Sequence, residues 1–180
     1  QFKMKIDLEN FNIETGNLLL VPISMKYAET IFDVFDDEIT KYMYPATPKK
    51  IEDTRVFIES SIDGILRSEE IVVAILKKDT HEYIGNGGLH HIDTKTPELG
   101  IWIKKEAHGH GYGKEAVRAL KEWADKNLSY EYITYPVAEE NIPSRKIPES
   151  LGAKEVLRYP KTNQSGITMN MVEYHIYPVK

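Results

Sequence analysis

The stretch from Glu98 to Ala116, ELGIWIKKEAHGHGYGKEA, leads from an apolar strand into an amphipathic helix through a turn with glycine at 109, 111 and 113. Glycine allows positive φ angles and a close approach of the backbone to a ligand. The N–H groups of the first helical turn have no partners within the helix, and they attract anions. We therefore interpret the turn as a cradle for a phosphate or pyrophosphate. The spacing alone leaves a turn without any ligand open as the alternative.

Short elements alternate on both sides of this turn. The strongest helix is expected from Lys114 to Asn127, where apolar side chains occupy one face and charged side chains the other. Further helices are expected at Met25–Asp37, Ile51–Leu66 and Ile142–Leu151. Seven runs have the composition of strands: Asn17–Ile23, Ile71–Leu76, Tyr83–Ile92, Leu99–Ile103, Tyr132–Val137, Ala153–Arg158 and Thr168–Tyr177. This order predicts an α+β fold in which helices flank a mixed sheet.

The composition limits the domain count and the classes of partner. A chain of 180 residues with 41% hydrophobic and 28% charged residues predicts one globular domain, spanning 1–180. With 23 basic against 28 acidic residues the net charge is −5, which argues against nucleic acid as a partner. The chain has no cysteine, so disulfides, thiolate zinc sites and a cysteine nucleophile are excluded. No apolar run approaches the roughly 18 residues of a membrane span, and no signal-peptide pattern is visible. We therefore expect a cytoplasmic protein that binds neither nucleic acid nor membranes.

The glycine turn resembles the acetyl-CoA motif of the GNAT superfamily of N-acetyltransferases, in which Gln/Arg-x-x-Gly-x-Gly/Ala follows a strand. The motif positions here are His108, Gly111 and Gly113, and His108 departs from the usual Gln or Arg. A second stretch, NIPSRKIPESLG from Asn141 to Gly152, resembles the Asn-x-x-Ser-Arg-x-x-x-Glu-x-Leu-Gly signature of the RimJ/RimL-like branch. That branch includes the N-terminal acetyltransferases of ribosomal proteins. The two motifs together are specific for the superfamily and much less specific for the acceptor.

The resemblance implies a GNAT fold, a mostly antiparallel central sheet built from the seven strand-like runs, with the fourth and fifth strands splayed apart. It also implies an acetyl-CoA-dependent enzyme in which a primary amine attacks the thioester directly. The expected acceptor is a protein or peptide N-terminus, and the expected assembly is a monomer or a homodimer. The alternatives are an acetyltransferase for a polyamine or an aminoglycoside, and a CoA-binding module without catalytic activity.

The resemblance further assigns a site for the cosubstrate. Its pantetheine arm is expected to pair with the exposed backbone between Gly100 and Ile103, where the N–H of Ile101 or Trp102 is the expected oxyanion donor. Core packing is the alternative for Ile101 and Ile103, and a helix cap is the alternative for Asn141. The residues expected to contact acetyl-CoA are Ile101, Trp102, Ile103, His108, Gly109, His110, Gly111, Tyr112, Gly113, Lys114, Asn141 and Arg145.

Two side chains are expected to take part in catalysis. Glu98 matches an acidic position of the branch and is the expected general base, acting directly or through water, with a solvated strand-end carboxylate as the alternative. Ser144 is expected to donate a proton toward the leaving thiolate. Many family members carry a tyrosine acid where this chain has Pro148, so that Ser144, Tyr174 or water must supply the proton. Proline also lacks the helical N–H, and it therefore predicts a kink or break near Ile147.

The remaining candidates concern the acceptor and metals. The aromatic loop Tyr42–Tyr44 falls where the family binds acceptors, as does an acidic cluster comprising Asp33, Asp36, Asp37 and Glu38. His108 and His110 permit a metal site as a third hypothesis, but without thiolates we expect none. We assign no chemistry to the strand histidines His90, His91 and His175, and we expect activity to survive replacement of His90 by alanine.

Overall fold

The apolar run from Ile71 to Leu76 forms the centre of strand β3 (Glu70–Lys77) in the computed structural model, which describes residues 5–179. Alternate side chains of this run belong to two buried clusters, Ile71, Val73 and Ile75 to one and Val72, Ala74 and Leu76 to the other. A strand that is covered on both faces carries such an unbroken apolar run, whereas a strand with one wet face alternates. Strand β3 therefore lies at the centre of the fold, between two layers of helices.

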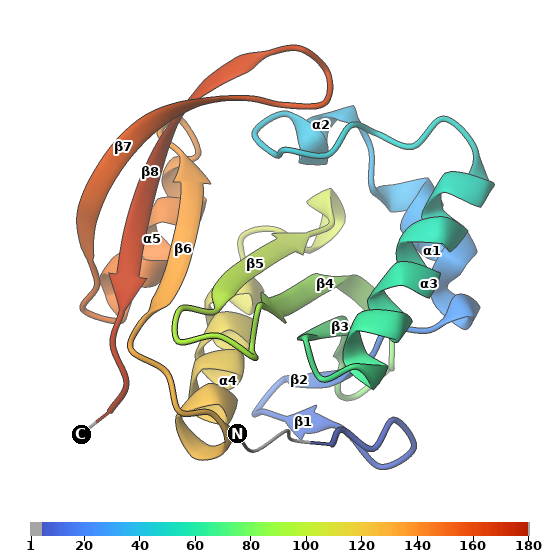
Figure 1. Ribbon diagram of the computed structural model, residues 1–180. Helices are drawn as coiled ribbons and strands as arrows, with labels where there is room; N and C mark the ends of the chain where they lie inside the picture. The colour runs from blue at the N-terminus through green and yellow to red at the C-terminus, as the bar shows by residue number, and fades with distance from the viewer. Residues whose placement is uncertain (1–4, 180) are drawn as a thin grey trace.

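The described strands form one open sheet in the order β1-β2-β3-β4-β5-β6-β8-β7 (Figure 1). Neighbouring strands are antiparallel except for the parallel pair β5 and β6. The other strands are β1 (Ile13–Glu14), β2 (Leu18–Pro22), β4 (Tyr83–His90), β5 (Glu98–Ile103), β6 (Ile133–Ala138), β7 (Lys154–Thr162) and β8 (Thr168–Ile176). The predicted α+β class with a mostly antiparallel sheet is confirmed. The strand that the sequence did not predict is β1, whose two residues are too few to show a pattern.

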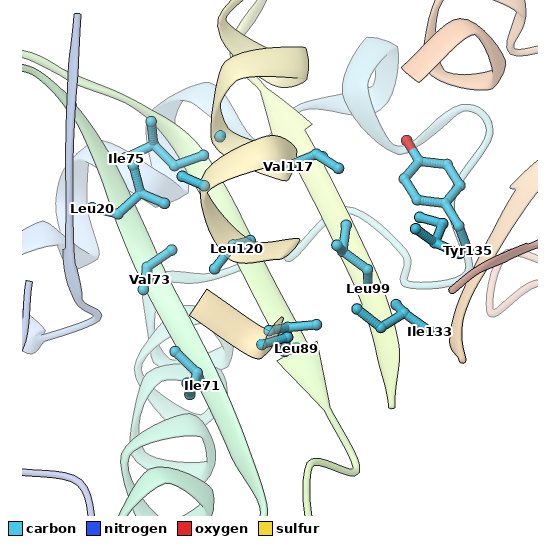
Figure 2. Close-up of a cluster of buried hydrophobic side chains, with 14 of the residues drawn as sticks. Leu20, Ile71, Val73, Ile75, Leu89, Leu99, Val117, Leu120, Ile133 and Tyr135 are labelled. Atoms are coloured by element: carbon cyan, nitrogen blue, oxygen red, sulfur yellow. The ribbon is translucent and has the colours of Figure 1, made fainter. Parts of the chain in front are cut away.

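Helices cover both faces of the sheet. The cluster that contains Ile71 packs beneath α4 (Tyr112–Asn127), with Val117 and Leu120 pointing toward the strands (Figure 2). The opposite cluster packs against α1 (Ala28–Val34) and α3 (Ile51–Leu66). The other helical segments are α2 (Asp37–Thr40), α5 (Ile142–Ser150) and the 3-10 turns Met25–Tyr27 and Lys105–Ala107. No helix in the described part of the chain is long and apolar enough to cross a membrane. The one-domain prediction also covers 1–4 and 180, which lie outside the described residues.

The helix expected at Met25–Asp37 is shorter than predicted and is followed by a second one. Phe35 leaves the helical conformation, with φ −87° and ψ 74°. Asp36 then caps α2, because its carboxylate accepts hydrogen bonds from the backbone N–H groups of Glu38 and Ile39, both at 3.1 Å. An aspartate cap starts a new helix wherever it satisfies the first N–H groups. The apolar periodicity runs across this boundary and therefore concealed it.

Helix α5 continues past Pro148, so the break expected near Ile147 is not observed. Proline 148 has no N–H to donate to the carbonyl of Ser144, which would be its partner in the helix. The hydroxyl of Tyr135 on β6 donates to this carbonyl instead, at 3.1 Å. A donor from the sheet therefore satisfies the carbonyl that the proline leaves unpaired.

Strands β5 and β6 separate soon after they begin. Glu98 and Thr134 form the one register pair between them, whereas β5 pairs with β4 along its whole length and β6 pairs likewise with β8. The two strands diverge visibly in Figure 1. This is the splay expected between the fourth and fifth of the predicted strands. The edge of β5 that faces β6 consequently has free backbone groups beyond its first residues.

Glu115 on the first turn of α4 ties that helix to the β1–β2 turn. Its carboxylate accepts hydrogen bonds from the Thr15 hydroxyl at 2.5 Å and from the backbone N–H and side-chain amide of Asn17, both at 2.9 Å. Burial opposes the charged form, but these hydrogen bonds outweigh it and lower the pKa of Glu115 below 4.5. The carboxylate therefore holds the helix that begins at the glycine turn in place.

We expect Glu115→Ala to lower the free energy of unfolding by about 1–2 kcal/mol, since hydrogen bonds to a partly exposed carboxylate are lost. Because the folded-state pKa is depressed, this contribution is present above pH 4.5 and is lost as the pH falls through the folded value. Urea unfolding at several pH values measures it. The control is Glu122→Ala on the exposed face of the same helix, which should change stability by less than about 0.5 kcal/mol. Equal losses of unfolding free energy in Glu115→Ala and Glu122→Ala would contradict the anchoring role of Glu115.

Candidate active site

A cavity of about 690 Å³ opens between the two halves of the sheet. One wall is formed by β4 and β5, with Asn86, Glu98 and Trp102. The opposite walls are formed by the loop 42–49 with the start of α3, and by β6 with α5, which contribute Tyr135 and Ser144. Both predicted catalytic residues, Glu98 and Ser144, therefore line the same cavity, from opposite sides of the strand splay.

Two glycines form the floor of the cavity. Gly88 on β4 and Gly100 on β5 are register partners, so they lie side by side on one face of the sheet. Side chains two residues apart on a strand point to the same face. On the face of Gly88 and Gly100, the pair Asn86 and Trp102 therefore lies on one side of the glycines, and the pair His90 and Glu98 lies on the other. The glycines leave a channel between two rows of larger side chains, where an acceptor can approach the splay.

The predicted cosubstrate residues on β5 divide between the cavity and the core. Ile101 and Trp102 line the cavity. Ile103 packs against the cluster beneath α4, so its side chain has a core role, and its carbonyl oxygen lies 2.6 Å from Nε2 of His108. A strand edge with free N–H and C=O groups can pair with an extended ligand. The open edge of β5 therefore fits the pantetheine arm that the sequence predicted there.

The glycine turn has the geometry that an anion cradle requires. Gly109 and Gly111 have φ angles of +85° and +76°, and a Cβ at either position would meet no protein atom within 4 Å. Helix α4 begins at Tyr112 without any side-chain cap. The N–H groups of its first turn therefore have no helical partners and can bind a pyrophosphate. Gly113 serves packing instead, because a Cβ there would lie 3.3 Å from Cδ1 of Ile147.

The two histidines of the turn have local partners. Nε2 of His108 donates to the carbonyl of Ile103 and holds the turn against the end of β5. The ring of His110 stacks on Tyr112 with centroids 5.4 Å apart. Within residues 5–179, no group of three or more His, Asp or Glu side chains gathers in a way that could hold a metal ion. His108 therefore replaces the family's usual Gln or Arg as an anchor for the loop.

A pair of hydroxyl groups lies on the β6 side of the cavity. Oη of Tyr135 is 2.7 Å from Oγ of Ser144, and the Ser144 N–H donates to the side chain of Asn141 at 3.4 Å. Burial raises the pKa of Tyr135 to about 12, although the hydrogen bond to Ser144 acts in the opposite direction. The phenol therefore stays protonated at neutral pH, and its proton can turn from the Ser144 carbonyl to Oγ once Ser144 has given up its own proton. The sequence did not predict Tyr135, because strand alternation alone places it in the core.

Two residues predicted near the chemistry lie outside the cavity. The hydroxyl of Tyr174 donates to Glu149 at 2.8 Å and accepts from Nε of Arg145 at 3.2 Å. Arg145 also donates to the carbonyl of Glu139 at 3.1 Å. The network fixes α5 on β8, and neither Tyr174 nor Arg145 is among the residues that line the cavity. The structure therefore brings Asn141 and Ser144 to the cavity and holds Arg145 in a network between α5 and β8, and the contact of Arg145 with the cosubstrate stays a prediction.

The aromatic loop reaches the cavity, whereas the acidic cluster does not. The backbone N–H of Gln164, in the β7–β8 turn, donates to the carbonyl of Tyr44 at 2.9 Å, and this holds the loop over the cavity. Tyr42 and Met43 line the cavity with Tyr44. In the cluster, Asp36 caps α2 and Glu38 pairs with Lys105 at 2.9 Å. The acidic residues predicted to meet the acceptor are therefore absent from the cavity lining.

Comparison with known proteins agrees with this geometry. The sequence matches the family model for the acetyltransferase (GNAT) domain over residues 17–154. The uncharacterized N-acetyltransferase p20 of Bacillus licheniformis is 29% identical over 140 residues, 76% of this chain and 79% of its own. An acetyltransferase (GNAT family) from Bacillus anthracis has the same fold, with TM-score 0.79, 20% identity and coverage of 93% and 98% of the two chains. The ribosomal alpha-N-protein acetyltransferase RimL, solved with coenzyme A, has TM-score 0.82, 14% identity and coverage of 93% and 98%.

We expect Gly111→Ala to weaken CoA binding by about tenfold, roughly the worth of one charge-assisted hydrogen bond. The new methyl group occupies the open side of the cradle, and isothermal titration with CoA measures the loss. The control is Gly152→Ala, which has the same kind of positive φ, +80°, and the same open surroundings after α5. Both variants pay a similar backbone cost, but only the first should change the Kd. Equal affinities in the two variants would contradict the cradle.

We expect Ser144→Ala and Tyr135→Phe each to lower kcat by about tenfold, because each interrupts the path of a proton to the thiolate. If the two hydroxyls act as one unit, the double variant should be no slower than the slower single variant. Thiol release at saturating substrates measures kcat, and a melting curve of each variant shows that it is folded. Effects that multiply would show that the hydroxyls act independently.

Proposed function

Because the chain belongs to the GNAT family of acetyl-CoA-dependent N-acetyltransferases, we propose that it acetylates the α-amine of a protein or peptide N-terminus. The observation that carries this choice of acceptor is the side chain of Asn86. Asn86 is 4% exposed and lines the cavity, and its Nδ2 is buried without a hydrogen-bond partner. Leaving a buried donor unpaired costs about 1–3 kcal/mol, so an unpaired donor in a cavity is a natural contact for a ligand.

The orientation of Asn86 is set by Tyr83. The Tyr83 hydroxyl donates to Oδ1 of Asn86 at 2.6 Å, and burial raises the pKa of that phenol, which keeps it protonated. Nδ2 is consequently the free end of the amide. Thr54 at the start of α3 adds a second buried polar atom without a partner, its Oγ1, and Thr54 lines the same cavity. Two residues of the cavity wall therefore carry buried polar groups without partners, and a small movement of either side chain would bring its group to a ligand with hydrogen-bonding groups of its own.

The free end of Asn86 distinguishes the classes of acceptor. Nδ2 can only donate, so its partner must carry an acceptor atom. A peptide N-terminus has a carbonyl oxygen next to its α-amine, whereas a protonated polyamine has donors alone. An aminoglycoside offers hydroxyl and ether oxygens, which also accept hydrogen bonds. The side chain therefore disfavours a polyamine, and the choice of a peptide over an aminoglycoside rests on the carbonyl that stands directly beside the α-amine. The structural likeness to RimL, a ribosomal alpha-N-protein acetyltransferase, agrees with this choice.

The cavity holds groups for each step of a direct transfer. The N–H groups on the open edge of β5, at Ile101 or Trp102, can stabilise the oxyanion that develops on the thioester carbonyl. Glu98, which the sequence predicted as the general base, lines the cavity and places a negative charge where the amine binds. Ser144 and Tyr135 supply a proton to the leaving thiolate. The acetyl group passes to the amine with no covalent intermediate on the enzyme.

We expect kcat/KM for an amino-acid amide to exceed that for the same amine without its carbonyl by about tenfold to 100-fold, since Asn86 would lose its partner. In Asn86→Asp the free donor becomes an acceptor and the hydrogen bond from Tyr83 is kept, so the gap should shrink. Because the wild type and Asn86→Asp are compared on the same two substrates, the difference in basicity between the two amines cancels.

A panel of a short peptide, spermidine and an aminoglycoside, assayed by thiol release, completes the test. Preference for the peptide supports the proposal, and preference for spermidine contradicts it. The Kd of CoA should be the same in Asn86→Asp as in the wild type. If the variant instead weakens CoA binding, Asn86 contacts the cosubstrate and the choice of acceptor loses its support.

A further inference from the structure

Three titratable side chains form a row across the centre of the sheet. Glu70 on β3 is the register partner of His90 on β4, and His90 is the register partner of Glu98 on β5. Cross-strand partners point to the same face, so all three lie on the face that carries the glycine floor. Residues from three separate parts of the sequence therefore meet at the edge of the cavity.

Glu70 fixes the imidazole of His90. Nδ1 of His90 lies 2.7 Å from Oε2 of Glu70. An ionised carboxylate can only accept a hydrogen bond, so Nδ1 of the neutral ring carries the proton in this contact. Nε2 then holds the lone pair. The arrangement leaves the basic nitrogen at the end of the ring that points away from Glu70.

Nε2 of His90 reaches over the glycine floor. A Cβ built at Gly88 would lie 3.1 Å from Nε2, and a Cβ at Gly100 would lie 4.0 Å from it. His90 lines the cavity together with Glu98, Trp102 and Asn86. The lone pair is therefore directed into the space where the acceptor amine must lie to reach the splay.

Helix α3 leaves room for the carboxylate that holds His90. Gly64 lies inside α3, where glycine costs about 1 kcal/mol relative to alanine. A Cβ at Gly64 would come within 2.4 Å of Oε1 of Glu70. Any side chain at this position would push Glu70 away from His90. The glycine in the helix therefore keeps the Glu70 carboxylate beside the imidazole.

We propose that His90, oriented by Glu70, accepts the proton of the acceptor amine in place of Glu98, which reverses the sequence-based expectation that activity survives His90→Ala. The inference rests on the proposed function and names the base for its reaction. An imidazole, with an ordinary pKa near 6.5, is better matched to an α-amine near 8 than is a carboxyl group near 4.3. Glu98 then acts as a fixed negative charge that attracts the ammonium and stabilises the imidazolium.

The protons balance as follows. The α-ammonium gives one proton to Nε2 of His90, and the neutral nitrogen forms a bond to the thioester carbonyl carbon. The C–S bond breaks, and the thiolate takes the second proton lost by nitrogen, through Ser144 and Tyr135 or through water. The imidazolium returns its proton to water. The products are an amide, CoA as its thiol and one released proton.

Several charged groups lie around His90. Glu70 faces it from β3 and Glu98 from β5. Lys49 lines the same cavity from the loop before α3, Asp53 from the first turn of α3 and Lys161 from β7. A variant at Glu70 changes the nearest of these charges without touching the cavity wall, since Glu70 itself is not among the lining residues.

The test uses His90→Asn, which keeps an N–H close to the position of Nδ1 for Glu70 and removes only the base at Nε2. We expect kcat to fall about 100-fold in this variant. In Glu70→Gln the ring loses the carboxylate that fixes its tautomer, so kcat should fall by about tenfold while KM for the amine stays within about twofold. In Glu98→Gln the acidic limb of the kcat profile should persist. The acceptor is whichever amine of the panel reacts fastest, so failure of the peptide assignment leaves this test intact.

A matched control comes from a second pair of the same kind. Nε2 of His175 lies 2.7 Å from Oε2 of Glu173 on β8, and neither residue lines the cavity. His175→Gln should keep kcat within about twofold of the wild type, as expected for a substitution outside the site. A loss of activity in His175→Gln equal to that in His90→Asn would mean that breaking any such pair disturbs the fold, and it would overturn the proposal.

A readout without any acceptor separates orientation from catalysis. NMR of the His90 ring nitrogens should show the proton of the neutral ring on Nδ1 in the wild type and shared between Nδ1 and Nε2 in Glu70→Gln. An unchanged tautomer would overturn the role of Glu70. Activity of His90→Asn within about twofold of the wild type, or loss of the acidic limb in Glu98→Gln alone, would overturn the role of His90 and assign the base to Glu98.

Discussion

The parallel pair of β5 and β6 is the constraint on which the site depends. β5 pairs along its length with β4, and β6 pairs along its length with β8, but the two strands share only the register pair of Glu98 and Thr134. Backbone N–H and C=O groups need partners, and the free edge of β5 has none from β6 beyond that point. An extended ligand can satisfy this edge. The same separation lets the cavity pass from the acceptor face to the β6 side.

The two halves of the sheet contribute different chemistry to the cavity. The half formed by β3, β4 and β5 supplies the glycine floor, the unpaired amide of Asn86 and the pair of Glu70 and His90. The other half supplies the hydroxyls of Tyr135 and Ser144. A proton can therefore leave the amine on one side while another reaches the thiolate on the opposite side. This division is possible because the reacting groups meet at the splay.

Contiguous sequence motifs predicted the residues expected to bind the cosubstrate, whereas the side chains on the acceptor side of the cavity are brought together by the register between strands. The glycine turn is contiguous in sequence, so its spacing pointed to an anion cradle while leaving a turn without any ligand open, and the open geometry at Gly109 and Gly111 is compatible with a cradle. Glu70 and His90 are 20 positions apart, and only the pairing of β3 with β4 brings them together. A single sequence contains no signal for that register. The same limit explains why Arg145, next to a predicted donor, is bound in a network outside the cavity.

Pro148 shows how one substitution can remove a catalytic group and position another. The family resemblance leads to a tyrosine acid at this position, and a proline cannot donate a proton. The proline also leaves the carbonyl of Ser144 without its helical partner, and a buried carbonyl requires a donor. Tyr135 is that donor, and the contact places its hydroxyl 2.7 Å from Oγ of Ser144. Pro148 therefore accounts for the hydroxyl pair, because the carbonyl that it leaves without a helical partner orients a phenol from the sheet.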